Sequence, residues 1–121
     1  MEEVVLKLNN FEGPFDLLLN LIEKNKMKIS DINISQLIDE YLEVLKVSKR
    51  ENIEIKSDFI IIASELIEIK TLNLLNLDKD KEKETNLRRR LEEHKIFKEV
   101  IPKVAKLEKE FNISYSRGES K

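Results

Sequence analysis

Residues that break helices are almost absent from this chain, which has two glycines and two prolines among 121 residues. Leucine, isoleucine, lysine and glutamate dominate instead, and apolar residues recur at the helical spacing of about 3.6 residues. The sequence therefore predicts an all-α fold, a small bundle of about four helices. The length fits one modest domain, or one domain with a tail.

The same composition excludes several classes of function. With no cysteine, the chain has no disulfide, no thiolate zinc site and no cysteine nucleophile. Two glycines cannot build a phosphate-binding glycine-rich loop. A net charge of −2 lacks the basic excess typical of nucleic-acid binders. We expect a soluble protein, because the longest apolar stretch, Phe59 to Ala63, is far too short to cross a bilayer.

Local signals mark the first two helices. Pro14 suits the first position of a helix that ends near Lys24. Asn33, followed three residues later by Gln36, has the spacing of a capping box at the start of a second helix that ends near Lys49. Before both helices, Val4 to Leu8 is predicted to form a short strand or an extended arm.

A third helix is expected from Ser57 and Asp58, as capping residues, to about Leu75. Its apolar residues span about half of its circumference, including Ile60, Ile67 and Leu74. Ile61 and Leu72 fall on the far side, beside Glu65 and Glu68. Such a helix needs burial on more than one side, so it is the centre of a bundle, the seam of a homodimer or a surface for another protein. The pattern leaves these three interpretations open.

The charged run 78–86 is interpreted as a flexible linker or as the frayed start of the next helix. From about Leu87 a fourth, partly detached helix is expected, with Pro102 causing a kink or a break. Its apolar pattern continues to about Asn112.

Few residues suggest chemistry. His94 is the single histidine and is interpreted as an ordinary helix residue, because no serine lies in a nucleophile-elbow motif. The basic cluster Arg88–Arg90 has glutamates on both sides, which favours a solvated helix face, although a weak contact with DNA stays open. We expect no cofactor and no metal. The residues alone predict a helical interaction module rather than an enzyme.

Several segments, in the same order, resemble the family of segregation and condensation protein A (ScpA), the bacterial kleisin. The segment from Phe11 to Leu19 reads Phe-Glu-Gly-Pro-Phe-Asp-Leu-Leu-Leu and is similar to the family's opening signature. The other matching segments are Leu21 to Lys24, Met27 to Ile32, Gln36 to Leu42, Asp58 to Leu75, and Glu93 to Lys98. Phe15, Glu40 and Asn76 depart from the family pattern, where leucine, glutamine and proline are usual.

The resemblance implies a non-enzymatic, cytoplasmic and nucleoid-associated subunit of the SMC–ScpA–ScpB complex, which condenses and segregates chromosomes. It implies an amino-terminal helical domain (1–77) that binds the coiled-coil neck of SMC, a linker (78–86) and the start of a middle region (87–121) that meets a ScpB dimer. The family's carboxy-terminal winged-helix domain is expected to be missing here. DNA would be bound only indirectly through the complex, and no membrane contact is expected.

On this basis we predict two sets of contact residues. The SMC-binding set is Ile61, Glu65, Glu68, Leu72 and Leu75. The ScpB-binding set is Leu91, Phe97, Ile101 and Val104. The alternative is an unrelated helical adaptor that self-associates through helix 57–75, and some self-association of the isolated chain is expected in either case.

Overall fold

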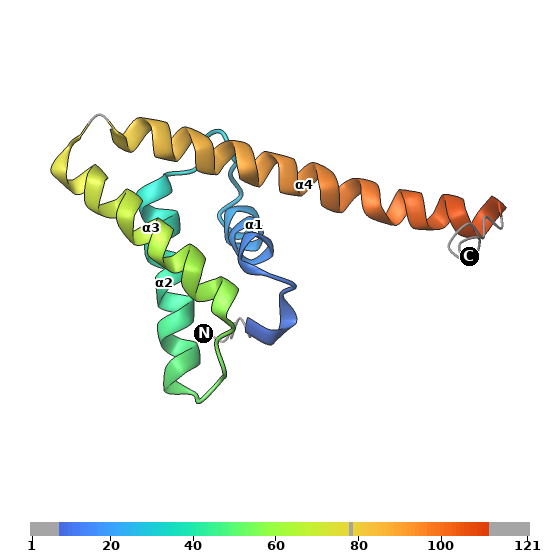
Figure 1. Ribbon diagram of the computed structural model, residues 1–121, viewed down its shortest axis with the longest axis horizontal. Helices are drawn as coiled ribbons and strands as arrows, with labels where there is room; N and C mark the ends of the chain where they lie inside the picture. Colours follow the sequence, from blue (N-terminus) through green and yellow to red (C-terminus); the bar gives the residue numbers. More distant parts are fainter. Residues whose placement is uncertain (1–7, 78, 112–121) are drawn as a thin grey trace, which may run out of the picture.

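The computed structural model describes residues 8–77 and 79–111, and four α-helices account for most of them. They are α1 (Pro14–Lys24), α2 (Ile34–Arg50), α3 (Ser57–Leu75) and α4 (Lys79–Phe111), preceded by one 3-10 turn, η1 (Leu8–Asn10) (Figure 1). Residues 8–77 and 79–111 contain no strand, so the all-α prediction is confirmed for them. The predicted arm from Val4 lies outside the described residues except for Leu8, which begins η1.

The starts of α1 and α2 follow the sequence signals. Pro14 occupies the first turn of α1, after an extended Gly13. Asn33 caps α2, because its side-chain oxygen accepts a hydrogen bond of 3.0 Å from the backbone N–H of Gln36. The side chain of Gln36 donates a hydrogen bond of 3.1 Å to Oε2 of Glu40.

The bounds of α3 are as predicted, but its predicted cap is wrong. Lys56 is the N-cap residue and provides no side-chain hydrogen bond, while Ser57 is already the first helical residue. The helix ends at Leu75 and is followed by the C-cap residue Asn76, which adopts the left-handed conformation with φ 59°. Asparagine tolerates this conformation better than most residues and so suits the reversal from α3 to α4.

The core lies between α1, α2 and α3. Tyr41 crosses it from α2, and its hydroxyl donates a hydrogen bond of 2.8 Å to the carbonyl of Phe59 in α3. On the outer side of the α2–α3 contact, Nζ of Lys70 binds Asp39 at 2.8 Å and Ser35 at 2.7 Å. The fully buried apolar side chains of these three helices include Leu17, Leu18, Leu37, Ile38, Leu66 and Ile69.

Helix α4 lies across one end of this three-helix unit and projects well beyond it (Figure 1). Leu87 and Leu91 are fully buried and add to the core. From Glu99 to Phe111 every side chain except that of Glu108 is exposed, which agrees with a partly detached last helix.

Two expectations for this region are corrected in part. Residues 79–86 form the first turns of α4, as in the second of the two interpretations, rather than a flexible linker. Two of the charged side chains have partners on α3: Glu84 accepts from Asn73 at 3.0 Å, and Lys83 lies 3.5 Å from Glu68. A kink or a break was predicted at Pro102, and the break does not occur, because α4 continues through this residue. One lost backbone hydrogen bond does not end a helix in which good helix formers such as Glu99, Ala105 and Leu107 flank the proline within two turns.

Candidate interaction surfaces

Helix α3 exposes a long apolar surface on the side away from the core, which we call the α3 face. Ile61 is 65% exposed, Leu74 73% and Leu75 62%. These values are high for large apolar side chains, and they occur side by side on one helix. The α3 face comprises Ile60, Ile61, Ser64, Ile67, Glu68, Thr71, Leu74 and Leu75.

The α3 face has the relief of a shallow groove. Ile60, Ile67 and Leu74 form one row with a spacing of seven residues, and Ile61, Glu68 and Leu75 form a second. At 100° per residue, the small side chains of Ser64 and Thr71 lie between these rows. Helices of a coiled coil pack on one another through a seven-residue repeat of this kind.

The α4 side of α3 is occupied by contacts within the chain. Glu65 forms a two-pronged pair with Arg90, in which Nη2 lies 3.0 Å from Oε1 and Nη1 contacts Oε2. The hydrogen bond with Glu65 raises the pKa of Arg90, which keeps this guanidinium charged. The Arg90 guanidinium also lies 5.1 Å from the centre of the Phe15 ring in α1, within the range of a cation–π contact.

The other two residues of the arginine cluster have partners as well. Nη1 of Arg88 donates to the carbonyl of Ile29 at 2.6 Å, which ties α4 to the loop after α1. Arg89 pairs with Glu93 of the same helix at 3.0 Å. The cluster therefore contributes to the structure of this chain. Only Arg89 is exposed, whereas Arg88 and Arg90 are partly buried, so the cluster is not the solvated helix face that was predicted.

His94 packs against Phe15, with 6.0 Å between the ring centres. Its side chain is half-buried, and its Nε2 atom is buried without a hydrogen-bond partner in the described part of the chain. These contacts fit the interpretation of His94 as a packing residue of the helix.

The projecting part of α4 carries a second apolar surface, which we call the α4 stripe. It comprises Phe97, Val100, Val104, Leu107 and Phe111, spaced alternately by three and four residues. This spacing is the a/d pattern of a coiled-coil seam. All five side chains are exposed, from 44% for Val100 to 65% for Phe111.

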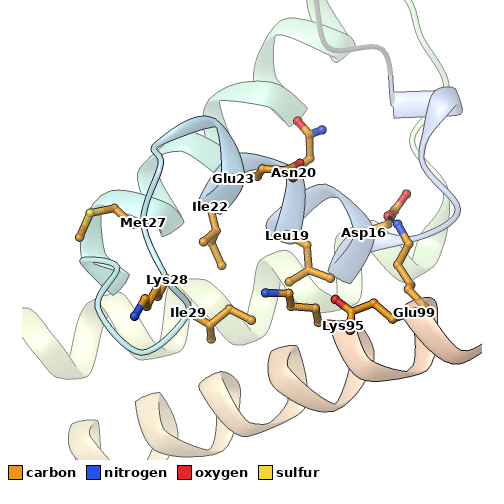
Figure 2. Close-up of a pocket in the computed structure, with 11 residues that line it drawn as sticks. Asp16, Leu19, Asn20, Ile22, Glu23, Met27, Lys28, Ile29, Lys95 and Glu99 are labelled. Carbon is orange, nitrogen blue, oxygen red and sulfur yellow. Dashed lines mark hydrogen bonds and ion pairs between the residues drawn. The ribbon is translucent and has the colours of Figure 1, made fainter.

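An open cavity of about 440 Å³ lies between α1, the following loop and α4. Figure 2 shows Leu19 and Ile22 extending from α1 toward α4, with Ile29 beside them. Lys28, Lys95, Glu23 and Glu99 line its edges. Because these charges balance and the cavity is open, it favours no particular ligand. Among residues 8–77 and 79–111, no cluster of His, Asp or Glu side chains could hold a metal ion.

Comparison with known proteins decides the family. Residues 21–121 match the family model described as segregation and condensation protein ScpA. The chain belongs to the ScpA family. Within the described helices of this ScpA-family chain, none is long and apolar enough to span a membrane.

Curated ScpA proteins give the same result. The chain is 44% identical to segregation and condensation protein A of Clostridium perfringens over 106 residues, which are 83% of this chain and 43% of that protein. It is 41% identical to that of Clostridium tetani over 120 residues, covering 92% and 47%. For Halothermothrix orenii the identity is 36% over 116 residues, covering 93% and 48%. The chain thus spans less than half the length of these curated relatives.

The residues predicted to bind SMC fall into two groups in this ScpA-family structure. Ile61 and Leu75 are highly exposed on the α3 face. Leu72 is half-buried and Glu65 is engaged by Arg90, so both lie toward α4, while Glu68 sits on the second row and contacts Lys83. The predicted set therefore follows the edge of the exposed surface rather than its centre.

Sequence reasoning missed the other half of the α3 face. Ile60, Ile67 and Leu74 were grouped with the broad apolar half of the helix, yet they are 49%, 50% and 73% exposed. Their seven-residue spacing was the available signal.

The predicted ScpB-binding residues are also divided. Phe97, Ile101 and Val104 are 60%, 46% and 45% exposed on the projecting part of α4. Leu91 is 0% exposed and packs in the core, so the described surface does not offer it to a partner.

Proposed function

We propose that this chain is the amino-terminal part of a kleisin subunit that acts without enzymatic activity in chromosome condensation and segregation. In this proposal the α3 face binds the coiled-coil neck of an SMC protein. Membership of the ScpA family supports the general role. The observation that carries the specific proposal is the α3 face, an uncovered apolar surface with coiled-coil spacing.

The relief of the α3 face suits a partner helix. Side chains of an approaching helix would enter the groove above Ser64 and Thr71, between the row of Ile60, Ile67 and Leu74 and the row of Ile61 and Leu75. Each buried Å² of apolar surface contributes about 25 cal/mol, so covering these exposed side chains is a substantial driving force. Among the sequence-predicted residues, Ile61, Glu68 and Leu75 remain in this contact, whereas Glu65 and Leu72 border it.

The proposed contact with a ScpB dimer is formed by Phe97 and Val104 of the α4 stripe and by Ile101 beside it. Its support is the exposed apolar surface on a helix that leaves the three-helix unit. Leu91 is left out of this contact because of its burial. DNA would be bound only through the complex, since Arg88, Arg89 and Arg90 all pair within the chain.

The test is light scattering during size-exclusion chromatography of this chain alone and mixed with an SMC head-plus-neck fragment. A one-to-one complex supports the proposal. A tight homodimer that ignores the SMC fragment would favour the alternative, an adaptor that self-associates through helix 57–75.

Variants locate the contact. Ile67→Glu with Leu74→Glu places two charges on the α3 face and is expected to weaken SMC binding at least ~100-fold, since each buried unpaired charge is costly. The matched control is Ile96→Glu with Leu107→Glu, two similarly exposed apolar residues of α4. The single change Ile61→Glu tests the edge of the face nearer to α4. Equal affinity for the α3 variant and the α4 control would contradict this assignment.

A further inference from the structure

Helix α4 is attached to the rest of the chain by two kinds of contact with different geometry. The apolar contacts come from Leu87 and Leu91, which are one helical turn apart and fully buried. Two side chains this close hold the helix to the unit, but they would not by themselves fix the direction of its axis. The remaining contacts are the ring contact of His94 with Phe15 and polar contacts on either side of this point, among them Glu84 with Asn73, Lys83 with Glu68 and those of three further cations.

Three cations of α4 reach three different parts of the chain. Arg88 donates to the carbonyl of Ile29 in the loop after α1. Arg90 pairs with Glu65 of α3, and Lys98 contacts Asp16 at the start of α1. At 100° per residue, Arg88 and Arg90 leave nearly opposite sides of the helix, and Lys98 lies about two turns further on. The three contacts thus restrain the direction of the helix axis from three different points.

We propose that Arg88, Arg90 and Lys98 are positioning residues that set the direction in which α4 leaves the three-helix unit. The leucines hold α4 in place, and the cations orient it. The consequence is that the α4 stripe is presented at a fixed angle to the α3 face. This inference concerns the chain itself and does not depend on which partners bind the two surfaces.

Two features of the contacts support an orienting role rather than general packing. The Arg90–Glu65 pair is two-pronged, and such pairs constrain direction as well as distance. The Arg90 side chain is 28% exposed and that of Glu65 31%, so the pair remains sensitive to substitution and salt without being needed to close the core.

The test is a distance measurement within the chain. Because there is no native cysteine, spin labels can be attached after Ser64→Cys on α3 and Lys106→Cys on the projecting part of α4. Pulsed electron–electron double resonance then gives the distribution of distances between the labels. Both positions are exposed.

The test variant is Arg88→Ala with Arg90→Ala, and the matched control is Arg89→Ala, whose side chain pairs only within α4. We expect the distance distribution to widen at least twofold in the double variant and to stay unchanged in the control. Helical content should remain the same in both, which separates a change of direction from unfolding. Glu65→Gln, which leaves α4 itself unaltered, should widen the distribution to a smaller extent.

An exchange of the two charges tests whether the ion pair or side-chain packing sets the orientation of α4. Exchanging the pair, Arg90→Glu with Glu65→Arg, should narrow the distribution relative to Arg90→Glu alone. An unchanged width in both the double variant and Glu65→Gln overturns the proposal. Widening that the exchange does not reverse also overturns it, because the orientation would then depend on side-chain packing and not on the ion pair.

Discussion

At the scale of single residues, Leu91 and Leu107 belong to the same helix and occupy opposite environments. Leu91 is 0% exposed and Leu107 51%. Leu91→Ala is expected to lower the free energy of unfolding by about 3 kcal/mol through the cavity that it leaves. Leu107→Ala should change it by less than about 0.5 kcal/mol. Urea unfolding followed by circular dichroism measures both, and similar losses would contradict the placement of Leu91 in the core.

Tyr41 gives a prediction that depends on pH. Burial, and secondarily the nearby Asp58 carboxylate, raise the pKa of the Tyr41 hydroxyl well above its usual value. The folded state therefore favours the neutral phenol, and this contribution to stability is complete below the unfolded-state pKa of about 10. It is lost as the pH rises above that value toward the folded-state pKa.

The comparison is with Tyr41→Phe, which lacks the hydrogen bond to the Phe59 carbonyl. At pH 7 we expect this variant to be less stable by about 1 kcal/mol. The difference from the unsubstituted chain should shrink between pH 10 and pH 11, because only the chain with Tyr41 must keep a phenol protonated. Unfolding free energies of both proteins at pH 7, 10 and 11 check this, and a constant difference would speak against a raised pKa.

At the scale of elements, Pro102 lies inside α4 without ending it. Proline lacks the backbone donor and costs about 3 kcal/mol relative to alanine in the interior of a helix. Pro102→Ala should therefore stabilise the projecting part of α4. We expect slower hydrogen exchange for the backbone amides of residues 99–108, with no change for those of α2. Unchanged exchange in α4 would mean that its projecting part is held by something other than its own hydrogen bonds.

The starts of the helices differ in how well the sequence alone predicts them. The starts of α1 and α2 were predicted because Pro14 and Asn33 act locally, within one turn. For the start of α4 the sequence left two interpretations open, because Glu84 and Lys83 find their partners, Asn73 and Glu68, on another helix.

For the α3 face, periodicity showed that the helix has too many apolar residues for one buried side. It could not show which residues α2 and α4 leave uncovered. That depends on where the two neighbouring helices lie, and the Lys70–Asp39 and Arg90–Glu65 pairs mark these positions. The predicted binding residues accordingly include one core residue, Leu91, and omit Ile60, Ile67 and Leu74.

At the scale of the whole molecule, the exposed apolar surface predicts weak self-association of the isolated chain. The average mass measured by sedimentation should rise with protein concentration. Ile67→Ser with Leu74→Ser should flatten this rise, while Met27→Ser, a change at an exposed apolar side chain outside the α3 face, should not. A rise that is the same in all three proteins would mean that the α3 face takes no part in it.

Because α4 extends far beyond Leu91, its last buried leucine, a small rotation of the helix at this residue causes a large displacement at its end. From Leu91 to Phe111 the helix extends about 30 Å at 1.5 Å per residue. A pivot of about 10° at Leu91 would therefore displace Phe111 by roughly 5 Å, the separation of neighbouring side chains along a helix face. A rotation too small to alter the core would thus move the end of α4 by about the length of one turn of a partner helix.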